Sequence, residues 1–156
     1  MPLERARKII LGIGNPDRGD DAAGRSVAQF LRQQNPRDVE IIEHNGEATS
    51  LLAQISGASV ALIVDACSAG APPGTVHRFN VCAAPLPQAQ IGLSTHGMGL
   101  TEAIELARAL RQLPTRCVVY AVEGTQFDIG AGLSPPVLAA IRDVAARIVA
   151  ELDETP

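Results

Sequence analysis

One stretch decides the fold of this chain: Lys8–Gly24, with the sequence KIILGIGNPDRGDDAAG. Its apolar run from Ile9 to Ile13 is typical of a strand that is covered on both faces. The Gly, Asn and Pro residues that follow predict a tight turn, and a helical pattern begins at the adjacent acids Asp20 and Asp21. A buried strand that leads directly into a helix predicts a parallel α/β sheet.

The two acids have two compatible explanations. Asp20 can cap the helix, and Asp21 can sit in its first turn, where the helix dipole attracts negative charge. In an open α/β sheet, however, ligands bind beyond the carboxyl ends of the strands. The sequence leaves open whether Asp21 only stabilises the helix or also points into a site.

Alternating strand and helix patterns continue along the chain. Strands are expected near residues 39–43, 60–64, 75–79 and 116–122, and helices near 20–34, 48–55, 100–110 and 134–152. The pattern predicts a single three-layer α/β domain over residues 1–156, with a mostly parallel, twisted sheet and helices on both faces. The 75–79 strand is the expected antiparallel exception, with His77 at the surface. Ser134 is the expected N-cap of the last helix.

Composition restricts the partners and the location. The 156 residues are 46% hydrophobic and carry a net charge of −4, with one Tyr and no Trp, which argues against nucleic acid as a partner. Cys67, Cys82 and Cys117 form no C-x-x-C pair, so neither a disulfide framework nor a thiolate zinc site is expected. The apolar run near the N-terminus stops too early for a signal peptide or a membrane span. We therefore expect a cytoplasmic protein without a membrane partner.

Asp21, Asp65 and His96 are the candidate metal ligands. Each lies on a loop or a strand end that a parallel sheet gathers at one edge. Two carboxylates and one imidazole suit a divalent transition metal, and three protein ligands leave positions open for water or substrate. The alternative is that Asp21 stabilises a helix, Asp65 forms a turn and His96 bonds to backbone carbonyls. Spacing alone does not choose between these interpretations.

Other motifs point less clearly to a function. A dinucleotide site needs glycine at position 17, where this chain has Asp17, and no cofactor-binding residue is predicted. Cys67 fits a small buried thiol better than a soft metal ligand or a nucleophile. His44 and Glu47 follow a strand, where they either line a pocket or, by default, face solvent as turn residues.

Four blocks of the chain resemble a known family. Gly12–Gly24, Ile63–Ala66, Ser94–Leu100 and Gly132–Pro135 are similar, in order and spacing, to the signature blocks of the hydrogenase maturation endopeptidases. The resemblance implies an α/β fold with a twisted central sheet. It also implies an enzyme that trims the C-terminal extension from the large-subunit precursor of a nickel–iron hydrogenase. The resemblance further implies that the precursor delivers the nickel, and that the enzyme reads the bound nickel as a signal that the precursor is ready for cleavage.

The resemblance assigns the nickel contacts to Asp21, Asp65 and His96. Our mechanistic hypothesis is that Asp21 and Asp65 are the catalytic residues, with attack either by a carboxylate, as in an aspartyl-type protease, or by a metal-polarised water. Relatives often have a Gly/Thr-rich turn where this chain has residues 44–47, so the client hydrogenase stays open. Two alternative functions are a non-catalytic module that binds nickel and the precursor, and a peptidyl-tRNA hydrolase-like esterase, whose T-R-H-N stretch this chain lacks.

Overall fold

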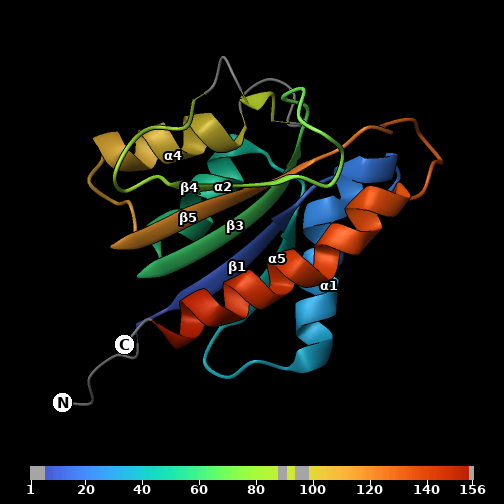
Figure 1. The fold of residues 1–156 in the computed structure, drawn as a ribbon. Coiled ribbons are helices and arrows are strands. Elements are labelled where there is room, and N and C mark those ends of the chain that lie inside the picture. The colour runs from blue at the N-terminus through green and yellow to red at the C-terminus, as the bar shows by residue number, and fades with distance from the viewer. Residues whose placement is uncertain (1–5, 88–90, 94–98, 155–156) are drawn as a thin grey trace.

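A five-stranded sheet lies between two layers of helices in the computed structural model of the protein, which describes residues 6–87, 91–93 and 99–154 (Figure 1). The strands and helices follow one another along the chain as β1 (Lys8–Ile13), η1 (Gly19–Ala22, a 3-10 turn), α1 (Ala23–Gln34), β2 (Glu40–His44), α2 (Ala48–Ser56), β3 (Val60–Cys67), β4 (Val76–Asn80), α4 (Leu100–Ala109), β5 (Arg116–Glu123) and α5 (Pro135–Asp153). This architecture confirms the predicted α/β class.

The sheet has the strand order β2-β1-β3-β5-β4. The first four strands in this order are parallel, whereas β4 runs antiparallel to β5 at one edge, as the sequence predicted. The carboxyl ends of the parallel strands therefore meet at the same edge of the sheet. Two of the predicted site residues, Asp21 and Asp65, lie on elements at that edge.

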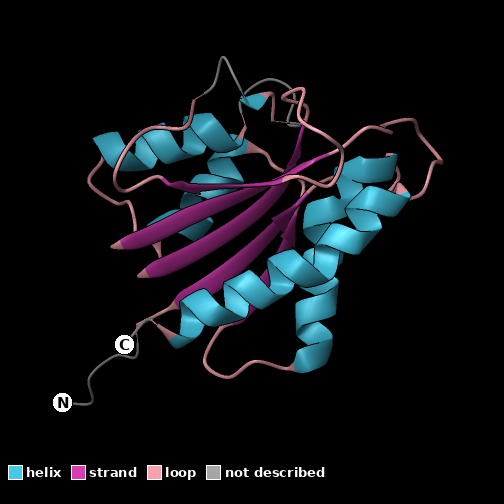
Figure 2. Ribbon diagram, in the orientation of Figure 1, coloured by secondary structure: helices cyan, strands magenta, loops and turns pink. Residues whose placement is uncertain are grey.

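Side chains from alternate positions of the strands build a core on each face of the sheet. Leu62 and Val64 of β3 pack with residues of α1 and α5, whereas Ala61 and Ile63 pack with residues of α2 and α4. Figure 2 shows the same division, with α1 and α5 on one side of the strands and α2 and α4 on the other. Every residue of β3 is buried, as expected for a central parallel strand.

The start of α1 lies so close to the sheet that only glycine fits there. A Cβ atom on Gly24 would collide with the carbonyl oxygens of Ile13 and Val64. Likewise, a Cβ atom on Gly12 would collide with the carbonyl oxygen of Gly24. The missing side chains let η1, with its two acids, pack against the carboxyl edge of the sheet.

Two element boundaries differ from the sequence prediction. The regular helix begins at Ala23, because residues 19–22 form a separate 3-10 turn. Strand β3 does not end at Asp65 but continues to Cys67, because it keeps pairing with β5 as far as Glu123. As a result, Asp65 lies inside a strand and not in a turn. None of the helices in the described ranges is long and apolar enough to cross a membrane.

Candidate functional site

Asp21 is buried in η1, just beyond the carboxyl end of β1. One of its two carboxylate oxygens, Oδ2, accepts a hydrogen bond of 3.0 Å from the backbone N–H of Asn15. Oδ1 is also buried, and within the described part of the chain no group donates a hydrogen bond to it. Because a buried polar atom normally has a partner, an oriented carboxylate with one such oxygen is typical of a ligand site.

Asp20 is a structural residue, and its predicted role as a helix cap is wrong. Neither η1 nor α1 has a side-chain cap. Instead, Oδ2 of Asp20 accepts the backbone N–H groups of Thr125 and Gln126 at 2.9 and 3.0 Å and the hydroxyl of Ser134 at 2.8 Å. Oδ1 accepts the backbone N–H of Ser134 at 2.7 Å. This carboxylate ties η1 to the loop that follows β5.

Asp65 is fully buried near the end of β3. Its Oδ1 accepts a hydrogen bond of 2.8 Å from the backbone N–H of Ala66. Since side chains alternate along a strand, Asp65 faces the same side of the sheet as Ile63, toward α2 and α4. Strand β3 also contacts η1, so the two predicted acids lie on adjoining elements at one edge of the sheet.

The third predicted ligand, His96, lies outside the described residues. Leu93, three residues before it, forms a β-bridge with Cys67 at the end of β3. Gly99, three residues after it, precedes α4, where its N–H donates to Glu102. Of the described residues that flank His96 in the sequence, Leu93 therefore contacts the strand that carries Asp65.

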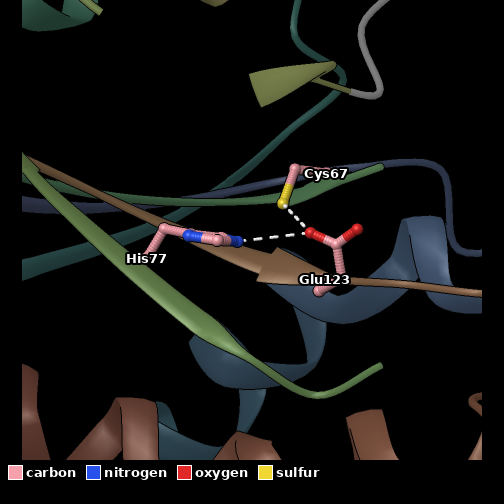
Figure 3. A group of neighbouring side chains, drawn as sticks. All are labelled: Cys67, His77 and Glu123. Carbon is pink, nitrogen blue, oxygen red and sulfur yellow. Dashed lines mark hydrogen bonds and ion pairs between the residues drawn. The ribbon is translucent and has the colours of Figure 1, made fainter. Parts of the chain in front are cut away.

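A second group of polar side chains meets beside Asp65, and Figure 3 shows its three members converging from β3, β4 and β5. Cys67 donates its thiol hydrogen to Oε2 of Glu123, with sulfur and oxygen 3.3 Å apart, and Nε2 of His77 lies 3.2 Å from the same oxygen. Cys67 and Glu123 are buried, and His77 is partly buried instead of exposed as the sequence predicted. Glu123 was not among the residues predicted from the sequence, although its position at the end of a predicted parallel strand was a usable signal.

The environment of this group changes its acid–base chemistry. Burial raises the pKa of the Cys67 thiol, and the neighbouring carboxylate of Glu123 raises it further. Burial alone would raise the pKa of Glu123, but hydrogen bonds from Cys67, Ala69, His77 and Gly70 outweigh it and hold the pKa below the ordinary value. Glu123 is therefore a carboxylate, and Cys67 a neutral thiol, when no cation is bound.

His44 and Glu47 make hydrogen bonds that stabilise the turn between β2 and α2 and the start of α2. His44 is buried, not solvent-facing, because its Nδ1 accepts the N–H of Gly46 and its Nε2 lies 2.9 Å from the hydroxyl of Ser50. Burial lowers the pKa of His44, which keeps the ring neutral. Glu47 is exposed and caps α2 by accepting the backbone N–H groups of Thr49 and Ser50.

Comparison with known proteins gives consistent matches. Residues 25–151 match the family model described as hydrogenase maturation protease. The hydrogenase 2 maturation protease of Escherichia coli is 26% identical over 152 residues, which cover 96% of this chain and 92% of that protein. The hydrogenase expression/formation protein HupD of Thiocapsa roseopersicina is 26% identical over 132 residues, and the match spans 60% of its length.

Solved structures show the same likeness. The hydrogenase maturating endopeptidase HybD from E. coli superimposes with a TM-score of 0.77 at 25% identity, covering 95% of this chain and 93% of that one. The NiFe hydrogenase maturation protease HybD from Thermococcus kodakarensis gives a TM-score of 0.73 at 25% identity, covering 94% of this chain and 98% of that one.

Proposed function

Since this chain belongs to the hydrogenase maturation protease family, we propose that it is an endopeptidase that removes the C-terminal extension of a nickel–iron hydrogenase large-subunit precursor. The family is one of peptidases, and the match confirms the resemblance seen in the sequence. The observation that carries the proposal is the oriented carboxylate of Asp21, whose buried Oδ1 has no hydrogen-bond donor among the described residues.

The residues at this edge suit nickel that arrives with the substrate. Asp21 and Asp65 offer carboxylate oxygens, and His96 supplies an imidazole in the sequence. Carboxylate and imidazole ligands are both used for divalent transition metals, and an incomplete set leaves coordination positions for the precursor's own ligands. Nickel would then serve as the signal that the precursor is ready, so the resting enzyme needs no nickel of its own.

Binding the precursor at these acids would place the scissile peptide beside two buried carboxylates. Asp21 and Asp65 would orient the precursor, and one of them would either attack the carbonyl carbon or take a proton from an attacking water. A single turnover in heavy-oxygen water separates these routes. Direct attack would release the C-terminal peptide as a free amine and leave a mixed anhydride between the carboxylate and the precursor. Water that opens this anhydride at the enzyme's carboxyl carbon puts heavy oxygen into that carboxylate, whereas direct attack by water labels only the product, so label in the enzyme is diagnostic of carboxylate attack.

The decisive experiment is the intact mass of a nickel-loaded large-subunit precursor before and after incubation with the protein. Loss of a C-terminal peptide in the nickel-loaded sample, and not in a nickel-free sample, is the expected result. Binding without any loss of mass from cognate precursors would favour a docking module that does not cut. Equal cleavage of the nickel-loaded and nickel-free precursors would support a protease but contradict the proposed role of nickel as a signal.

Asp65→Asn tests the second carboxylate, because it removes the charge and keeps nearly the same shape. Its Oδ1 can still accept the N–H of Ala66. Unchanged cleavage by a folded Asp65→Asn protein would contradict a role for this carboxylate.

We also propose that the protein works in the cytoplasm, because Cys67, Cys82 and Cys117 are all free thiols.

A further inference from the structure

Cys67, His77 and Glu123 form a group that the proposed cleavage does not use. Each offers a different ligand atom, and these atoms all lie within 4.8 Å of one another. We propose that these three residues form a second metal site, for a borderline-soft divalent cation such as Zn²⁺ or Co²⁺, distinct from the acids that read nickel. Spacing, supporting contacts and charge balance all favour such a site.

Two of the three distances between the ligand atoms are close to those around a tetrahedral ion. A zinc ion at about 2.0–2.3 Å from nitrogen, oxygen and sulfur ligands places those atoms roughly 3.3–3.6 Å apart. Here the Cys67 sulfur and the His77 Nε2 lie 3.3 and 3.2 Å from Oε2 of Glu123. The Cys67 sulfur and the His77 Nε2 lie within 4.8 Å of each other, so binding of one ion by all three atoms brings these two side chains to tetrahedral spacing, and three ligands leave one position for water.

Glu123 and His77 are each supported by neighbours that do not compete for the ion. The second oxygen of Glu123, Oε1, accepts the backbone N–H groups of Ala69 and Gly70 at 2.7 and 2.8 Å, which directs Oε2 toward Cys67 and His77. The His77 ring stacks on Phe79 at a centroid distance of 6.3 Å. Such supporting contacts orient the ligands of known metal sites and preserve their affinity. The three ligands also lie on three paired strands, which hold them in fixed register.

Charge balance also favours a divalent cation. A thiolate and a carboxylate carry two negative charges, so a divalent ion with a neutral imidazole gives a buried site of zero net charge. On binding, the metal–sulfur bond replaces the S–H bond of Cys67, and the thiol proton passes to solvent. The side chain of His77 is 27% exposed, which gives the proton and the ion a route to bulk water.

Cobalt substitution tests the site without any hydrogenase precursor. Titration of the full-length protein with Co²⁺ is expected to produce a thiolate-to-cobalt charge-transfer band that saturates at one ion per chain. Cys67→Ser should abolish the band. Cys82→Ser is the matched control, because Cys82 is a free but exposed thiol and should leave the band unchanged.

Two further variants keep the test decisive. His77→Gln removes one partly exposed ligand and is expected to weaken Co²⁺ binding by at least about tenfold. Asp21→Asn removes a nickel-reading carboxylate and should leave the band intact. Absence of a band in the unmodified protein, a band that survives in folded Cys67→Ser, or unchanged affinity in His77→Gln would overturn the second site. Since none of these measurements involves cleavage, they succeed or fail independently of the proposed protease function.

Discussion

Asp20 and Ser134 are joined by two hydrogen bonds across 114 residues of sequence. Ser134 donates its backbone N–H to one carboxylate oxygen and its hydroxyl to the other. The second oxygen also accepts the N–H groups of Thr125 and Gln126. Because Asp21 is the next residue, this network determines where the proposed catalytic carboxylate lies relative to β5 and α5.

Asp20→Asn is expected to destabilise the fold. An amide has only one accepting oxygen, so its NH₂ group must face a backbone N–H that now has no acceptor. We expect the free energy of unfolding to fall by about 3 kcal/mol, and Ser134→Ala, which removes only the hydroxyl donor, to cost about 1 kcal/mol. Urea unfolding monitored by circular dichroism measures both. Equal losses in the two variants would show that the carboxylate contributes no more than the hydroxyl.

Asp21→Asn should separate catalysis from folding. We expect cleavage of the nickel-loaded precursor to slow by at least about a hundredfold, because the carboxylate acts on the substrate. The free energy of unfolding should change by less than about 1 kcal/mol, because Asn can keep the hydrogen bond from Asn15. Asp17→Asn is the matched control, since Asp17 is an exposed acid in the same loop. Full cleavage by Asp21→Asn would contradict the proposed site.

Glu151 makes the fold sensitive to acid. Burial alone would raise its pKa, but hydrogen bonds from Arg78, Tyr120 and Arg116 lower the pKa to about 2 from an ordinary value of 4.5. The unfolded chain therefore binds a proton at a higher pH than the folded protein does. The stabilisation is complete above pH 4.5 and is lost as the pH falls toward about 2.

Glu151→Gln checks this pH dependence. The variant should be less stable at neutral pH, because Arg78 and Arg116 lose the counter-charge of the buried Glu151 carboxylate. It should also lose less stability than the unmodified protein between pH 4.5 and about 2. Urea unfolding over this range gives both values. Parallel acid curves for the two proteins would rule out Glu151 as the source of the effect.

His44 should resist protonation in the folded protein. Burial lowers its pKa below the ordinary value of 6.5, and its Nδ1 already accepts the N–H of Gly46. Below pH 6.5 the unfolded chain binds a proton that the folded ring does not, so stability falls with decreasing pH until the folded pKa is reached. An NMR titration should show the His44 imidazole protonating below 6.5. Protonation at or above this value would contradict the buried neutral ring.

The sequence by itself determined the fold class and brought the two proposed site acids to one edge of the sheet. Hydrophobic periodicity and turn chemistry are local, so the strand Lys8–Ile13, the turn after it and the antiparallel β4 strand were predictable from adjacent residues. The placement of Asp21 and Asp65 at one edge followed from the geometry of parallel strands. The short signature blocks were enough to identify the family.

Only the tertiary structure decided what each polar side chain touches. Asp20 was expected to cap a helix, but its carboxylate accepts donors from more than a hundred residues away, where backbone N–H groups need an acceptor. Cys67, His77 and Glu123 lie on three different strands and meet because β3, β5 and β4 pair in one particular register. Such contacts depend on long-range pairing, which leaves no local pattern in the sequence.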